Sequence, residues 1–295
     1  MIILNRLKMM IMFTKKPAFK FILGIIIIAV IYFANYSPES PVADDSLKVR
    51  FVDVGQGDCE IVQFPDGRNM IIDGGTNETS SELVNVIKSY GIKRFDYVVA
   101  THPHEDHIGG LDDVVESFEI GNVYLPDTSS TSVSFKNLLK SISQSGAKVN
   151  RAYEGVTMID ETDIKAEFLA PVSNDYEDAN NYSAVLKLTY KGFSFLFTGD
   201  AETISEHDMI ENGAYLKSDV LKVGHHGSTT STSNQFLRAV NPAVAVISVG
   251  RDNSYGHPHR EILERLSDLK LYRTDLNGTV TIFCDGERLS VSTEK

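Results

Sequence analysis

The sequence predicts an α/β domain in which two β-sheets pack face to face with helices on the outside. The first part of the body contains short alternating β runs joined by tight turns, at 47–54, 59–64 and 69–73. The later part alternates apolar β runs with helical segments. This order is typical of two packed sheets with helices on their outer faces. With 295 residues, 42% of them hydrophobic, the chain is long enough to bury such a core.

The remaining elements follow from apolar spacing and from turn signals. A Ser/Thr start, apolar residues at helical spacing and a Gly stop predict a helix over 79–91. Further helices are expected at 108–118, 132–145, 202–212, 232–240 and 259–268. Further strands are expected at 95–100, 123–125, 147–153, 164–170, 183–190, 193–198, 219–224, 243–249, 279–284 and 288–292. No internal repeat is visible, and one domain over 47–295 is predicted.

The first 46 residues differ in composition from the body. Residues 1–20 contain five basic residues and no acid. The segment 21–36 contains a continuous apolar run at 21–34, and 37–46 form a polar linker with proline. The apolar run has the length of a short membrane span or of a signal-peptide core. Basic residues before it and acids after it predict a cytoplasmic N-terminus. We expect a single-pass anchor in the cell membrane with an extracytoplasmic C-terminal domain; a secreted domain is the alternative if the segment is cleaved.

The charge of the body limits its partners. The net charge is −12, and subtracting the five positive charges of the leader leaves −17 for the rest. Such a body repels polyanions over most of its surface, which excludes the broad basic footprint of a DNA-binding protein. A phosphodiester can still enter where metal ions supply positive charge. Cys59 and Cys284 form no CxxC pair; we expect buried thiols, with one disulfide as the alternative.

The segment ATHPHEDHIGG carries the strongest chemical signal. Its candidate metal ligands are His102, His104, Asp106 and His107. Pro103 favours an extended conformation at the residue before it, and residues i and i+2 of an extended chain point to the same side. The first two histidines can therefore bind one ion, and a following helical turn brings Asp106 and His107 to a second. Imidazole and carboxylate ligands suit Zn²⁺, Mn²⁺ or Fe.

Two later strand ends supply further candidates. A two-ion site needs a bridging carboxylate, and Asp200 follows an apolar strand. The alternative role for Asp200 is to cap the helix at 202–212. Another strand ends at His225 and His226, of which we expect His226 to bind metal and His225 to contact substrate. Scattered solvated histidines are the other explanation, but seven of the eight histidines fall in three clusters and only His207 stands alone.

These motifs together resemble those of a known family. HPHEDH, with MIIDGG before it and FTGD and GHHGS after it, resembles the metallo-β-lactamase superfamily. FVDVGQGDCEIV, LFTGDAE, LKVGHHGSTTSTS and ISVGRDNSYGHPH are similar to the hydrolase domain of the ComEC/Rec2 competence proteins and their stand-alone relatives, over about 47–285. The resemblance implies an αββα sandwich of two mixed sheets with the metals at one edge. It implies that Asp73 orients the ligands, Asp200 bridges and His226 completes the second ion. One or two divalent ions are implied, with zinc favoured.

The sequence departs from the family pattern in two places. Many members carry another histidine ligand between the HxHxDH loop and the bridging aspartate, but no histidine lies between His107 and Asp200. The polar residues in that region are Asn180, Asn181 and Ser183. The first ion would then have His102, His104, Asp200 and water, which is still a catalytic format. The competence proteins also carry a multi-span channel region, whereas we expect one apolar segment here and no channel.

Several other residues are candidates for supporting roles. His257 precedes Pro258, and we expect it to contact a phosphate or a leaving group. His259 is expected to be structural. The GQGD loop presents backbone N–H groups to an anion or simply forms a tight hairpin, and Asp58 in it is expected near the site. The polar run 228–231 is expected to cap a helix.

Metal-assisted hydrolysis is the reaction that these residues predict, because bound ions lower the pKa of water and polarise the electrophile. The expected catalytic residues are Asp106, Asp200, His225 and His257, and the expected supporting or substrate-contacting residues are Asp73, Asp58 and Asn181. A phosphodiester is the first choice of bond, in nucleic acid (DNA) or in a cell-envelope polymer such as choline-bearing teichoic acid. One alternative is an amide or ester hydrolase of the β-lactam type. The other is a non-catalytic, DNA-binding accessory protein of DNA uptake, which the acidic body disfavours.

Overall fold

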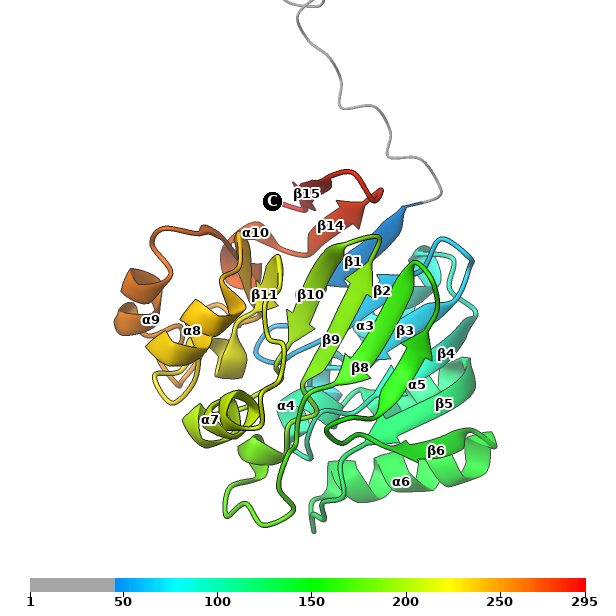
Figure 1. The fold of residues 1–295 in the computed structure, drawn as a ribbon. Helices are drawn as coiled ribbons and strands as arrows, with labels where there is room; N and C mark the ends of the chain where they lie inside the picture. Colours follow the sequence, from blue (N-terminus) through cyan, green and yellow to red (C-terminus); the bar gives the residue numbers. More distant parts are fainter. Residues whose placement is uncertain (1–45) are drawn as a thin grey trace, which may run out of the picture. The chain divides into compact units, whose positions relative to one another are not determined.

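A computed structural model of the chain describes residues 46–295, and these contain two β-sheets. The first sheet has the strand order β15-β14-β1-β2-β3-β4-β5-β6, and the second has the order β13-β12-β11-β10-β9-β8-β7 (Figure 1). The strands of the first sheet are β1 (Leu47–Phe51), β2 (Glu60–Gln63), β3 (Asn69–Ile72), β4 (Arg94–Val99), β5 (Glu119–Leu125), β6 (Lys148–Arg151), β14 (Val280–Cys284) and β15 (Leu289–Thr293). Those of the second are β7 (Thr157–Asp160), β8 (Ile164–Phe168), β9 (Leu186–Tyr190), β10 (Phe193–Phe197), β11 (Val220–Lys222), β12 (Val244–Ile247) and β13 (Lys270–Arg273).

Both sheets are mixed. In the first sheet β3 to β6 run parallel to one another, whereas β15, β14, β1, β2 and β3 pair antiparallel. In the second sheet β10 to β13 are parallel and β7 to β10 are antiparallel. The predicted pair of mixed sheets is therefore confirmed. The carboxyl ends of the parallel strands of each sheet lie at one edge, and the histidine-rich loops begin there.

The main core lies between the two sheets and follows the alternation of side chains along the strands. Phe195 and Phe197 of β10 face the other sheet, and the Phe197 ring lies 6.1 Å from that of Phe51 on β1. Leu196, between them, belongs to a separate cluster under the outer helices. One strand therefore contributes to two apolar layers, which is why these runs are apolar throughout.

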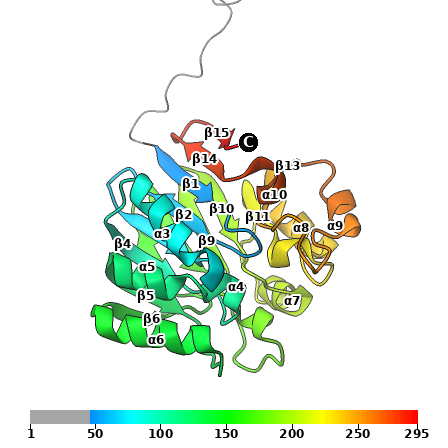
Figure 2. The same ribbon diagram turned by 180° about the vertical axis from the view of Figure 1, so that it is seen from behind.

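Helices cover the outer faces of both sheets. They are α3 (Ser80–Ser89), α4 (Glu105–Ile108), α5 (Leu111–Ser117), α6 (Val133–Ser145), α7 (Thr203–Glu211), α8 (Asn234–Val240), α9 (Arg260–Arg265) and α10 (Thr274–Asn277), with 3-10 turns η1 (Asn77–Thr79), η2 (Ala179–Tyr182) and η3 (Gly224–Gly227). Figure 2 shows α3, α5 and α6 in front of the first sheet, where they bury one continuous cluster. Helices α7, α8 and α9 pack on the second sheet near β11 and β12.

Some predicted elements are wrong in detail. The helix expected over 108–118 is observed as α5, and a separate short helix, α4, precedes it and is divided from it at Gly109 and Gly110. A side chain at Gly110 would lie 2.3 Å from the Gly74 carbonyl oxygen, so the chain folds closely there because it lacks one. Residues 228–231 do not cap α8, since Ser233 accepts the Phe236 N–H at 3.2 Å. The short elements β7, β13 and α10 were not predicted.

The N-terminal predictions lie outside the described residues. This applies to the basic leader, the apolar segment at 21–36 and nearly all of the linker. Within residues 46–295, no helix combines the length and apolar character needed to cross a bilayer. Cys59 and Cys284 are both buried free thiols, so the expectation of thiols is confirmed and the disulfide alternative is wrong.

Candidate metal centre

The candidate ligands converge at the carboxyl ends of strands from both sheets. Asp73 follows β3 and His102 follows β4, whereas Asp200 and His226 follow β10 and β11. Ligands of α/β proteins commonly bind beyond the carboxyl ends of parallel strands. The two sheets thus bring distant parts of the sequence to one edge of the molecule.

The HxHxDH segment takes the extended-then-helical course that its sequence predicts. His104 is the N-cap of α4 with extended dihedral angles, φ −75° and ψ 148°, and the helix begins at Glu105. His102 Nε2 lies 3.1 Å from His104 Nδ1. The first helical turn brings the His107 ring within 4.2 Å of the His102 ring, measured between centroids. Three imidazoles of this short segment therefore face one region.

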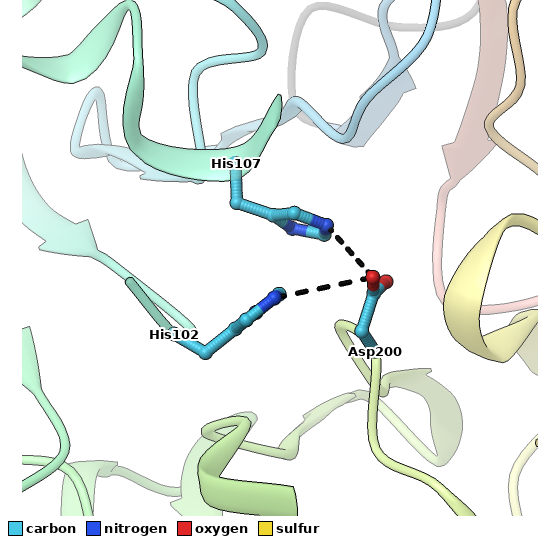
Figure 3. A group of neighbouring side chains, drawn as sticks. All are labelled: His102, His107 and Asp200. Carbon is cyan, nitrogen blue, oxygen red and sulfur yellow. Dashed lines mark ion pairs between the residues drawn. The ribbon is translucent and has the colours of Figure 1, made fainter. Parts of the chain in front are cut away.

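Asp200 joins this segment to the second sheet. Its Oδ2 lies 3.2 Å from His107 Nε2 and 3.9 Å from His102 Nε2 (Figure 3). It also lies 3.6 Å from His226 Nε2. The alternative role as a helix cap is not observed, because Glu202 occupies the N-cap position of α7. Asp200 has the central position that a bridging carboxylate requires.

The buried polar atoms test whether these residues fit metal ions. Four overlapping groups have ligand atoms within 4.8 Å of one another: His102, His107 and Asp200; Asp106, His107 and His226; Asp58, Asp200 and His226; and Asp58, Asp73 and His107. The buried atoms His107 Nε2, His226 Nε2 and Asp200 Oδ1 have no hydrogen-bond partner. Buried polar atoms are normally paired, so unpaired imidazole and carboxylate atoms that face one another fit divalent ions.

The electrostatics of the cluster fit cations as well. Burial disfavours the charged form of each histidine and aspartate in the cluster, but at most of these residues the attraction of oppositely charged neighbours is stronger. The carboxylates of Asp200 and Asp58 raise the pKa of His226 to about 10, and Asp200 and Asp58 also raise the pKa of His107. The same imidazoles hold the pKa of Asp200 and of Asp106 below its usual range. Positive charge in the form of protons therefore balances the carboxylates, and metal ions would take the place of those protons.

His107 is oriented from below by Asp73. Its Nδ1 lies 2.7 Å from Asp73 Oδ2, so its Nε2 faces Asp200. The carboxylate is itself fixed by the Thr101 N–H at 2.8 Å and the Thr101 hydroxyl at 2.6 Å. Outer contacts of this kind fix the tautomer and the direction of a ligating histidine.

Several residues at the centre adopt strained backbone conformations. Asp73, His225 and His226 have φ values of 56°, 51° and 53°, in the left-handed region that non-glycine residues rarely use. Gly227 follows with φ 83°, and a side chain there would come within 2.5 Å of Pro258 Cβ. Strained backbone conformations are common at functional sites, where contacts with the surrounding structure stabilise them. The GHHG turn is thus held in a shape that directs His226 inward.

The GQGD loop packs against the HxHxDH helix. A side chain at Gly57 would lie 2.2 Å from the Asp106 carbonyl oxygen, and the Asp58 N–H donates to that oxygen at 3.1 Å. The Asp58 N–H is therefore not free for an anion, which weakens the anion-binding interpretation. The Asp58 side chain is fully buried beside the centre, with Oδ1 3.3 Å from His226 Nδ1.

Polar residues occupy the region where many members of the family that the sequence resembles carry another histidine. Ser183 Oγ lies 3.4 Å from His102 Nδ1 and accepts the Asp200 N–H at 3.1 Å. Asn181 uses both ends of its amide elsewhere: it donates to Glu202 at 3.4 Å and accepts the Ser205 N–H at 3.2 Å. Asn181 therefore supports the start of α7 and does not face the cleft.

A cleft of about 400 Å³ opens over these residues. Its lining comprises Gln56, His104, Glu105, Asp106, Asn180, Asp200, His225, His226, Tyr255 and His257. A larger cavity of about 640 Å³ lies elsewhere, between α3 and the β14–β15 hairpin, and contains none of the four ligand groups. The smaller cleft is the one with reactive chemistry.

Two further histidines, His225 and His257, line the cleft. His225 Nε2 lies 3.7 Å from Asp200 Oδ2, and its Nδ1 lies 3.4 Å from Glu202 Oε1. The Nδ1 atom of His257 is buried without a partner. Burial, and then the neighbouring His259 and His225, lower the pKa of His257 to about 4, so its ring is neutral at pH 7.

Some predicted and some unpredicted residues have other roles. His259 accepts the Thr229 N–H at 3.0 Å, as expected for a structural residue. The sequence reasoning missed Glu202, although it follows the bridging aspartate closely in FTGDAE. It also missed Lys222, whose charge inside the apolar run DVLKVG was the available signal.

Comparison with known proteins agrees with this geometry. A family model described as the metallo-beta-lactamase superfamily matches residues 52–251. The chain belongs to the metallo-β-lactamase superfamily. Its His/Asp centre is the site of a metal-dependent hydrolase of this superfamily, as the first motif indicated.

Individual relatives narrow the relationship. ComE operon protein 3 of Bacillus subtilis is 32% identical over 252 residues, which cover 79% of this chain and 32% of that protein. Competence protein ComA of Neisseria gonorrhoeae is 32% identical, with 84% of this chain and 34% of that protein covered. The chain thus spans about a third of the length of these relatives. CmlA, a diiron beta-hydroxylase from Streptomyces venezuelae, shares the fold with a TM-score of 0.51 at 13% identity, over 83% of this chain and 55% of that one.

Proposed function

We propose that this metal-dependent hydrolase is a phosphodiesterase. The observation that carries the proposal is the position of Asp200, whose Oδ2 lies near His102 of the first expected ion site and near His107 and His226 of the second. A carboxylate shared in this way suits two ions side by side. Two adjacent ions stabilise both the attacking and the leaving oxygen of a phosphoryl group, and they lower the pKa of a bound water.

The residues around the centre then take separate tasks. Asp73 holds His107 in one tautomer, and Asp106 Oδ2 lies 3.3 Å from His226 Nε2. The Nε2 atom of His225 lies on the Asp200 side of the cleft, and its Nδ1 atom faces the Glu202 carboxylate. We therefore assign to His225 the delivery of a proton to the leaving oxygen. Neutral His257 lines the same cleft, and we assign it a hydrogen bond to the phosphoryl group.

The substrate proposed is a nucleic acid or a cell-envelope phosphodiester. Support comes from the names of two relatives, ComE operon protein 3 and competence protein ComA. The acidic body disfavours wide contacts with a polyanion, so the cleft and its ions would have to provide most of the attraction. We further propose that the segment at 21–36 anchors the chain and that the catalytic domain is extracytoplasmic. Protease added to wall-stripped intact cells should digest the domain; protection of the domain would contradict this topology.

The activity can be tested on four small substrates with the full chain loaded with Zn²⁺ or Mn²⁺. The substrates are bis-p-nitrophenyl phosphate, p-nitrophenyl phosphate, p-nitrophenyl acetate and nitrocefin, and they represent diester, monoester, carboxylic ester and β-lactam. We expect kcat/KM to be highest for the diester. Faster turnover of nitrocefin or of the acetate would replace the proposal with the amide/ester alternative. Absence of turnover in a metal-loaded protein would favour the accessory-protein alternative.

A further inference from the structure

A buried ion pair lies directly beneath the metal centre. Lys222, the last residue of β11, is 1% exposed, and its ammonium group contacts the carboxylate of Asp58, which is 0% exposed. Buried lysines and aspartates are rare unless they are paired. Replacing a buried ion pair by apolar residues is often neutral or stabilising. Folding alone therefore does not explain why a charged pair occupies this part of the interior.

Asp58 connects the pair to the second-ion ligands. Its Oδ1 lies 3.3 Å from His226 Nδ1 and its Oδ2 lies 3.7 Å from His107 Nδ1. Its backbone N–H donates to the carbonyl of Asp106 at 3.1 Å. One residue of the β1–β2 loop thus contacts the three residues that form the Asp106, His107 and His226 group.

Lys222 connects the pair to the bridging aspartate. Its ammonium donates to the Gly199 carbonyl at 3.2 Å, and the His225 N–H donates to the same oxygen at 3.2 Å. Gly199 directly precedes Asp200. The ammonium therefore links the β10–α7 turn of the second sheet to Asp58 of the first sheet.

We infer that the Asp58–Lys222 pair positions His226 and the Gly199–Asp200 turn for the second metal ion. His226 has two acceptors at Nδ1, the Ser248 carbonyl at 2.9 Å and Asp58. Only Asp58 also contacts His107 and Asp106. The pair acts through these residues and does not itself touch substrate. This inference depends on the metal centre and not on the choice of phosphodiester as substrate.

The test measures Zn²⁺ affinity in the full chain by competition with a chromogenic chelator. Lys222→Met leaves Asp58 without its partner, and we expect second-ion affinity to fall about 10- to 100-fold, the usual effect of losing an outer contact. Asp58→Asn leaves the ammonium unpaired and should weaken the same ion. In the double variant Asp58→Asn/Lys222→Met neither member of the pair remains as an unpaired charge, and the new amide oxygen at position 58 can still face His226. The double variant should therefore bind the second ion more tightly than either single variant.

A matched control separates this role from general packing. Lys187 on β9 is also buried, but its ammonium donates to the Tyr215 carbonyl at 2.7 Å. Lys187→Met should leave the affinity for both ions unchanged. The inference is overturned if folded Lys222→Met binds the second ion as tightly as the wild type. It is also overturned if the double variant binds that ion no better than Asp58→Asn, a comparison that remains valid when Lys222→Met does not fold. A wild type that binds two ions but cleaves no diester would refute the proposed phosphodiesterase and leave this inference intact.

Discussion

The two halves of the metal centre differ in how completely the protein encloses them. On one side His107 and His226 are buried, and both have carboxylate contacts at Nδ1 from Asp73 or Asp58. On the other side His102 is buried but His104 is exposed, and His104 belongs to none of the four ligand groups among the described residues. An ion in the His226 half would therefore be enclosed by buried ligands, whereas an ion in the His104 half would keep open positions.

This difference has a chemical reason. A catalytic metal site needs a free position for water or substrate, whereas a fully ligated ion cannot accept one. The cleft reaches both halves, through His104 and Asn180 on one side and through Asp106 and His226 on the other, but only the His104 half has an exposed histidine and so room for water or substrate. The His226 half would then hold the Asp200 carboxylate in place. We therefore expect the His226 half to bind its ion more tightly than the His104 half.

The largest expected effect comes from removing the residue that joins the two halves. Asp200→Ala should lower turnover of the preferred diester by about 10³-fold or more, because both ions lose a ligand and the charge that offsets their repulsion. Diester turnover and metal stoichiometry should be measured on the same preparation. Asp285→Ala serves as the control, because Asp285 also follows a strand, β14, but belongs to none of the four ligand groups. This variant should keep the diester turnover and the metal content of the wild type. Full turnover by Asp200→Ala would refute the shared-carboxylate mechanism.

A smaller effect is expected from a cleft residue that is proposed to touch only substrate. His257→Ala should lower kcat/KM about 10²-fold, the usual scale for one acid–base or electrostatic contact, with metal content unchanged. Metal analysis and kinetics on one preparation provide the check. Loss of an ion in this variant would instead identify His257 as a ligand, beside His226, whose ring lies 6.5 Å from its own.

The enclosed half should also control how stability depends on pH. In chelator-treated protein the carboxylates raise the pKa of His107 and hold that of His226 at about 10, above the unfolded value of 6.5. The protonated imidazoles stabilise the fold fully below pH 6.5, and that contribution disappears as the pH rises toward 10. The Tm of the metal-free chain should fall over this interval by several degrees. The zinc-loaded chain should lose less, because ions replace the protons; an equal decline in both forms would contradict this account.

The sequence predicted the centre better than it predicted the structure around it. The spacing within HPHEDH determines a local geometry, and strand ends place Asp200 and His226 at one edge, so these residues could be found without a structure. Lys222 could not be assigned a role, because a lysine in a short strand is equally consistent with a solvent-facing position. Only the packing of the two sheets brings it to Asp58.

The errors in the fold have a similar origin. The break between α4 and α5 depends on the close approach of Gly110 to the carbonyl of Gly74, a tertiary contact that helical spacing does not report. The strand β13 (Lys270–Arg273) has the sequence KLYR and is recognisable only by its parallel pairing with β12. Local pattern thus predicted the long apolar elements and missed those that packing alone defines.

The most direct test of the unequal halves is a stepwise Zn²⁺ titration of the full chain after chelation. Wild type, His226→Ala and His104→Ala are compared by competition with a chromogenic chelator. The account predicts two binding steps in the wild type. His226→Ala should remove the tighter step, and His104→Ala should remove only the weaker one. A single step in the wild type, or loss of the tighter step in His104→Ala, would contradict the account.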